Sequence, residues 1–232
     1  MTSNLLPDPT LLFRFKINVH RMPLVKNLED LTAWRLVDEH RIPPLGQFNS
    51  GCLPIQARIG WNPQGLFFAF SLGLWSHYTE RTPIPFQANI SVNSRYDSSV
   101  LRENEFCSGF HFHIEKRQVS NGIGNGVQSD LEVLRVMSRV GGNKPMPVDE
   151  SRKESLRGWI RTTATELSAW IHIGASEIPG YRPEEFPDIG LNYDLAAFDP
   201  ATYGSVLHWH LVHSFVGNSR SNPSLWTQCR LV

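Results

Sequence analysis

Short segments in which apolar and polar residues alternate, separated by turn-forming residues, are the feature that most constrains this chain. The clearest case is residues 57–61 and 66–72, joined by the sequence Asn62-Pro63-Gln64-Gly65. Proline presets φ and glycine accepts a positive φ, so the joining residues predict a tight turn. The whole segment therefore predicts a β-hairpin whose return strand faces a core.

The same pattern recurs along the chain and predicts a β-rich fold. A half-buried strand is expected at residues 11–19, and a helical turn at residues 28–36. A second hairpin is predicted at residues 159–165 and 167–173. Further strands are expected at residues 88–92, 106–114, 133–140, 189–196, 206–215 and 228–232. About nine to twelve short strands predict an all-β, immunoglobulin-like antiparallel β-sandwich with short helical turns, in one domain spanning residues 1–232.

The composition supports a globular protein and argues against two classes of partner. Hydrophobic residues make up 41% of the chain, which is enough for a sizeable core. Charged residues make up only 19%, and 22 Lys and Arg balance 22 Asp and Glu. A protein that binds nucleic acid or an anionic membrane carries a basic surface. We therefore expect neither nucleic acid nor membrane as a partner.

The N-terminal residues and the cysteines favour a cytoplasmic location. Pro7, Asp8 and Pro9 interrupt the first apolar stretch, so no signal peptide is predicted, and no apolar run is long enough for a transmembrane helix. The three cysteines are far apart and form no CxxC motif: they are Cys52, Cys107 and Cys229. Such cysteines are expected to be buried, reduced thiols.

No catalytic motif is present, and the question of enzymatic activity is left open with a preference for none. The sequence has no GxSxG, P-loop, dinucleotide-binding or HExxH motif. Two His-x-His pairs are the nearest approach to a metal site, because residues i and i+2 of a strand share a face. The four histidines are His111, His113, His208 and His210. Each pair could instead occupy the polar side of a strand whose aromatic neighbours point to the core.

Four segments in this order resemble the family 9 carbohydrate-binding modules and the wider DOMON-type sandwiches. They are residues 57–70, residues 90–95, residues 167–173 with 178–180, and residues 189–193 with Asp199, and the closing residues 222–226 and 229–232 also fit. The resemblance extends over most of the chain from about residue 57 onward. It implies a sandwich in which Trp61 and Trp226 pack in the core, and residues 1–53 are assumed to complete it.

The resemblance also implies a place for a ligand, with departures from the family pattern. Members of the family hold a sugar between two aromatic side chains, whereas Arg220 here stands where the second aromatic falls. The predicted saccharide site therefore uses Trp75 or Phe86 as the stacking face, with hydrogen bonds from Asn93, Arg95 and Arg220.

Three functions remain open from the sequence. The first is a non-catalytic module that binds a saccharide or another small polar ligand. The second is an interaction or scaffold protein that keeps the sandwich, has lost the sugar site and binds a protein partner. The third is a metal-binding protein that uses the His-x-His pairs. Calcium, as in some members of the resembled family, or a transition metal are the cofactors left open.

Overall fold

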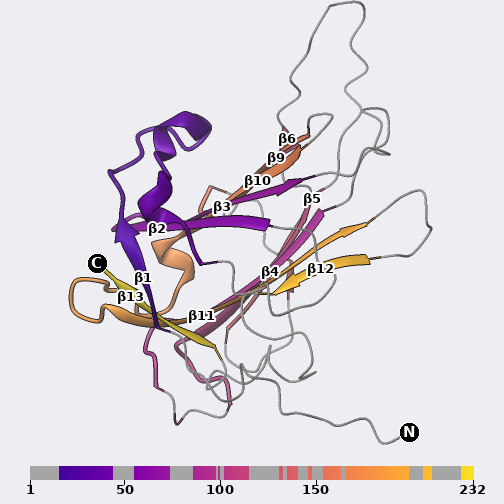
Figure 1. Cartoon of the computed structure of the whole chain (residues 1–232). Coiled ribbons are helices and arrows are strands. Elements are labelled where there is room, and N and C mark those ends of the chain that lie inside the picture. The colour runs from indigo at the N-terminus through magenta and orange to yellow at the C-terminus, as the bar shows by residue number, and fades with distance from the viewer. Residues whose placement is uncertain are drawn as a thin grey trace, which may run out of the picture.

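The computed structural model of the chain has two β-sheets joined through one strand (Figure 1). It describes residues 16–43, 55–73, 86–97, 99, 102–114, 131–132, 135–140, 146–147, 154–162, 166–198, 206–210 and 226–232. The strands are β1 (Lys16–Arg21), β2 (Ile55–Asn62), β3 (Gly65–Gly73), β4 (Phe86–Asn93), β5 (Cys107–Ile114), β6 (Leu131–Glu132), β7 (Arg135–Val140), β8 (Met146–Pro147), β9 (Leu156–Thr162), β10 (Glu166–Gly174), β11 (Asp188–Phe198), β12 (Val206–His210) and β13 (Thr227–Leu231). The only helical elements among the described residues are the 3₁₀ turns η1 (Leu31–Trp34), η2 (Asp38–His40) and η5 (Ala175–Glu177).

The two sheets are named here after their central strands. The β3 sheet has the order β6-β9-β10-β3-β2, and the β4 sheet has the order β13-β11-β4-β5-β7-β8. Strand β12 pairs with the second half of β11, on the same edge at which β13 pairs with the first half. All of these pairings are antiparallel. The all-β sandwich predicted from the sequence is confirmed.

Strand β1 joins the sheets and departs from the antiparallel expectation. Residues 16–19 pair in parallel with β13, and residues 20–21 pair in parallel with β2. One short strand thus belongs to both sheets in succession. The sequence pattern shows that β1 is half-buried but carries no information about its direction relative to its neighbours, because that direction depends on distant parts of the chain.

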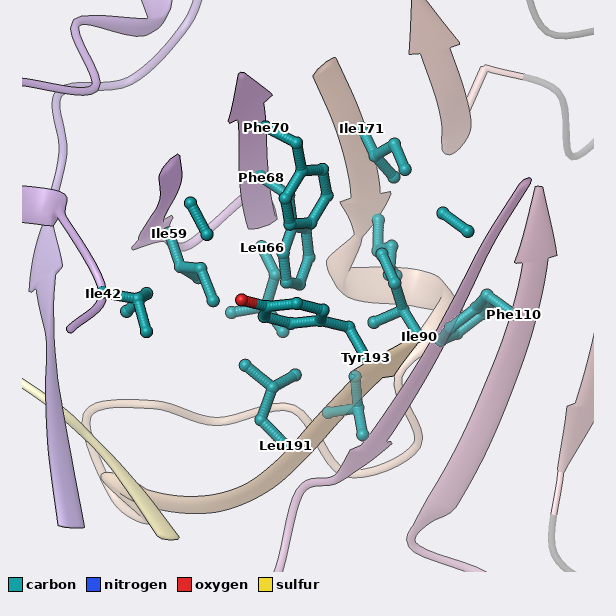
Figure 2. Close-up of a cluster of buried hydrophobic side chains, with 14 of the residues drawn as sticks. Ile42, Ile59, Leu66, Phe68, Phe70, Ile90, Phe110, Ile171, Leu191 and Tyr193 are labelled. Carbon is teal, nitrogen blue, oxygen red and sulfur yellow. The ribbon is translucent and has the colours of Figure 1, made fainter. Parts of the chain in front are cut away.

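The core lies between the sheets and consists of the inward residues of each strand. Phe68 and Phe70 of β3 face Ile90 of β4, while Leu191 and Tyr193 of β11 approach from the same side as β4 (Figure 2). The Tyr193 ring meets that of Phe70 edge-to-face, with 5.2 Å between centroids. Alternation along each strand places these residues inward and their neighbours outward.

The predicted hairpin at residues 57–72 is confirmed, and at Gly65 its backbone closely approaches that of residues 173–175. Gly65 has φ +143°, a conformation that side-chain-bearing residues rarely adopt. A Cβ at this position would also collide with the backbone of residues 173–175. The two tryptophans expected in the core, Trp61 and Trp226, are both 3% exposed, and the Trp61 indole donates a hydrogen bond to the Val232 carbonyl at 3.1 Å.

Replacing Gly65 with alanine is expected to lower the free energy of unfolding by about 1–3 kcal/mol or more, because the backbone is strained for any L-residue and the new methyl group meets backbone atoms. Urea denaturation measures the change. Pro63→Ala, at an exposed position of the same turn, is the matched control and should change stability by less than about 1 kcal/mol. Equal effects from the two substitutions would contradict the assignment of strain to Gly65.

Candidate functional site

Two of the sequence-predicted ligand residues are described in full, and they lie where β4 ends. Asn93 is completely buried, and its Oδ1 accepts a hydrogen bond from the Arg95 backbone N–H at 3.0 Å. Arg95 Nη1 donates to the carbonyls of Ser94 and Gly180, and the guanidinium stacks 3.5 Å from the Phe186 ring centroid. Arg95 therefore ties the turn at residues 178–186 to the end of β4.

The other predicted ligand residues are not described to the same extent. Trp75 and Arg220 lie outside the described residues, and for Phe86 only the backbone, at the start of β4, is described. The saccharide site expected from these residues stays a prediction.

The His-x-His pairs lie on strands that are not neighbours. His111 and His113 are on β5, and His208 and His210 are on β12, whose backbone alone is described here. Strands β4 and β11 separate them, so the two pairs are about 14 Å apart at a typical strand spacing. His111 Nδ1 forms a hydrogen bond with Asn89 Oδ1 at 2.6 Å, and Asn89 Nδ2 donates to Asp194. Among the described residues, no three potential ligands come together as a metal site.

A pocket of about 330 Å³ lies on the outer face of the β3 sheet, which is the face turned away from the β4 sheet. Its floor consists of outward-facing residues of three adjacent strands. The register places Arg58 of β2 opposite Ala69 of β3, and Ala69 opposite Trp170 of β10. The next row of the sheet brings Ser71 of β3 opposite Ser168 of β10. The sheet surface is hollow here because the small side chain of Ala69 lies between the large side chains of Arg58 and Trp170.

The wall over this floor is formed by residues 31–37, which follow β1. The Trp34 side chain is 1% exposed and packs edge-to-face on Phe67 and Trp159, at centroid distances of 5.1 and 5.4 Å. Its indole nitrogen donates to the Leu28 carbonyl at 3.1 Å. Trp34 thereby anchors η1 to the outer face of the sheet, and the residues around it line the pocket.

Glu166 supplies a carboxylate at one end of the pocket. Its Oε1 accepts hydrogen bonds from the hydroxyl groups of Ser71, at 2.5 Å, and Ser168, at 2.7 Å. These two bonds, with a smaller contribution from the charge of Arg58, lower the pKa of Glu166 against the opposing effect of burial. The carboxylate is therefore held both in a fixed orientation and in its charged form.

Arg58 and Arg35 supply positive charge to the same pocket. Arg58 Nη2 contacts Asp38 at 3.0 Å, but the Asp38 side chain is 91% exposed, so this ion pair is weak. Arg58 Nε is buried and has no hydrogen-bond partner in the described part of the chain. Arg35, at the end of η1, has φ 46° and ψ 39°, a left-handed conformation that costs a residue of this kind about 1–3 kcal/mol.

Trp170 provides an aromatic surface beside these charges. It lines the pocket, is partly exposed, and carries the Arg161 guanidinium 5.5 Å from its ring centroid. An aromatic ring, a fixed carboxylate and guanidinium donors around a hollow are the groups with which proteins bind polar ring-shaped molecules: the ring packs on the aromatic side chain while polar groups fix its orientation. Sequence inspection missed Glu166 and Trp170, although strand alternation already placed them on one face.

Comparison with solved structures identifies the fold. A family 9 carbohydrate-binding module from Caldicellulosiruptor kristjanssonii in complex with cellotriose matches with a TM-score of 0.51 and 11% identity, over 94% of this chain and 93% of that chain. A family 9 module from the same organism in complex with glucose matches with a TM-score of 0.54 and 11% identity, over 94% of this chain and 96% of the other. The chain has a fold like that of the family 9 carbohydrate-binding modules.

The fold resemblance expected from the sequence is thus confirmed, at an identity that establishes the fold alone. No protein-family model matches the chain, and no curated protein matches it. None of the helices in the described residues has the length and apolarity needed to cross a membrane.

A buried histidine, His172, lies beneath the pocket wall and is expected to make the stability of the protein depend on pH. His172 packs on Phe67 and Trp34, and burial lowers its pKa from 6.5 to about 4, partly offset by the Gln64 backbone. Between pH 6.5 and 4 the unfolded chain binds a proton that the folded chain does not. The free energy of unfolding should therefore fall as the pH falls through this range, by up to about 3 kcal/mol.

Chemical denaturation at a series of pH values measures this effect. In His172→Phe, which keeps an aromatic ring and removes the titrating group, the slope between pH 6.5 and 4 should be smaller than in the wild type. Parallel slopes for the two proteins would show that other groups cause the acid sensitivity.

Proposed function

We propose that this chain is a non-catalytic module that binds a saccharide in the pocket on the outer face of the β3 sheet. The observation that carries the proposal is the combination of Trp170, Glu166 and Arg58 around one hollow. A sugar presents an apolar C–H face, which stacks on an aromatic ring, and hydroxyl groups, which donate to a carboxylate and accept from a guanidinium.

The fold adds support to this assignment. The two similar solved structures are carbohydrate-binding modules in complex with cellotriose and glucose. The sequence places the saccharide elsewhere, near Trp75, Phe86, Asn93, Arg95 and Arg220. Two described members of that set already have structural partners: Asn93 Oδ1 bonds to the Arg95 backbone, and Arg95 bonds to two carbonyls.

Isothermal titration calorimetry against a panel of mono- and oligosaccharides tests the function, and variants locate the site. Trp170→Leu should weaken binding at least tenfold, because stacking is lost, whereas Trp170→Phe should retain most of the affinity. Ala69→Leu should abolish binding by filling the floor of the pocket while leaving every polar group in place. Thermal unfolding of each variant verifies that it is folded.

Trp75→Ala is the matched comparison for the alternative location. It should leave the affinity unchanged if the saccharide lies in the outer-face pocket. Loss of binding in Trp75→Ala together with wild-type binding in Ala69→Leu would keep the function and refute the pocket. No binding of any saccharide by the wild type would refute the function and favour the scaffold role.

A further inference from the structure

The pocket lining contains both positively and negatively charged residues, and their balance indicates which class of ligand the pocket would bind. Glu166 begins β10, four residues before Trp170, which places their Cα atoms about 13 Å apart along the strand. Arg58 lies in the same cross-strand row as Trp170, with Ala69 between them. The Glu166 side chain nevertheless reaches the hydroxyl groups of Ser71 and Ser168, in the row next to Arg58, and its carboxylate is close enough to feel the charge of that arginine.

The carboxylate of the pocket has its charge partly satisfied by hydroxyl groups of the protein, whereas Arg58 has only a weak, solvent-exposed ion pair. Glu166 Oε1 already accepts two hydroxyl hydrogen bonds. The Arg58 side chain is 26% exposed, and its ion-pair partner Asp38 is almost fully exposed to water, so this pair leaves much of the positive charge of Arg58 unbalanced. Arg35 adds a second guanidinium from the wall, so the pocket lining holds two arginines and one carboxylate.

Arg35 also has an unusual backbone conformation, with φ 46° and ψ 39° in the left-handed region. The position just after a helical turn that adopts the left-handed conformation is usually glycine, because glycine has no Cβ to clash. Arg35 is the only residue other than glycine with positive φ in the described part of the chain. An arginine that lines the pocket thus stands in a position where glycine would suit the backbone better.

We propose that the ligand is an acidic saccharide, and that Arg35 and Arg58 recognise its carboxylate. This inference rests on the proposed function and names the ligand class for the same pocket. A guanidinium matches a carboxylate through two parallel N–H donors, which a neutral hydroxyl cannot use in the same way. The sugar ring stacks on Trp170, its carboxylate meets the two arginines, and its hydroxyl groups donate toward the Glu166 end.

The test compares acidic and neutral sugars of the same ring configuration. Calorimetry is carried out with glucuronate against glucose and with galacturonate against galactose, using the full chain at low and high salt. The expected result is at least tenfold tighter binding of one uronate than of its neutral partner, with a preference that decreases at high salt because charged contacts are screened.

Arg35→Gly separates recognition from folding. This variant should lose the preference for the uronate, and its thermal midpoint should equal or exceed that of the wild type, because glycine fits the left-handed backbone. Arg35→Lys should keep part of the preference through its charge. Arg102→Gly, at an exposed position outside the pocket lining, is the control and should behave as the wild type.

The possible failures are distinguishable. Equal binding of acidic and neutral sugars would overturn the acidic ligand and leave the saccharide-binding function standing, whereas binding of no sugar would overturn both. Tighter binding of glucose 6-phosphate than of glucuronate would overturn the carboxylate and assign the arginines to a phosphorylated sugar. An unchanged uronate preference in Arg35→Gly would remove Arg35 from the recognition of the ligand.

Discussion

The pairing of β1 with both sheets is the constraint on which the rest of the structure depends. Its first residues hydrogen-bond to β13 of the β4 sheet, and its last residues to β2 of the β3 sheet. This arrangement closes one side of the sandwich and fixes where the chain leaves it. The next residues, 22–43, then pass over the outer face of the β3 sheet, where Met22, Val25 and Trp34 pack on Phe67 and Trp159. The pocket exists because β1 delivers this segment to that face.

As a result, both faces of the β3 sheet pack against other parts of the chain. Its inner face packs against the β4 sheet and forms the main core. Its outer face is apolar only where Trp34 covers it, and beyond that cover the same strands present Arg58, Ser71 and Glu166. The boundary between the covered and uncovered parts is where an aromatic surface and charged groups meet. A pocket forms at this boundary, lined by strand residues and by residues 31–37.

The sequence predicted the fold, whereas it did not predict the outer-face pocket, and the reasons for this difference are physical. Alternation and turn residues are local signals, so the hairpin formed by β2 and β3 and the burial of Trp61 follow directly from neighbouring residues. The pocket depends on register between strands far apart in sequence: Arg58, Ala69 and Trp170 become neighbours only when β2, β3 and β10 pair correctly. Nothing local showed which residues would stand beside Trp170 or that Trp34 would cover the adjacent surface.

The pairing of β1 with β13 also has a consequence for how the protein acquires its fold. These strands come from opposite ends of the sequence, and contacts of such high sequence separation form late because a long loop must be closed first. On the ribosome the two strands of the β2–β3 hairpin can pair as soon as they are made, whereas β1 has no β13 to pair with until residues 227–231 have been made. Residues 22–43 follow β1, so the cover over the outer face of the β3 sheet is expected to reach its final position only after β1 has paired with both β2 and β13.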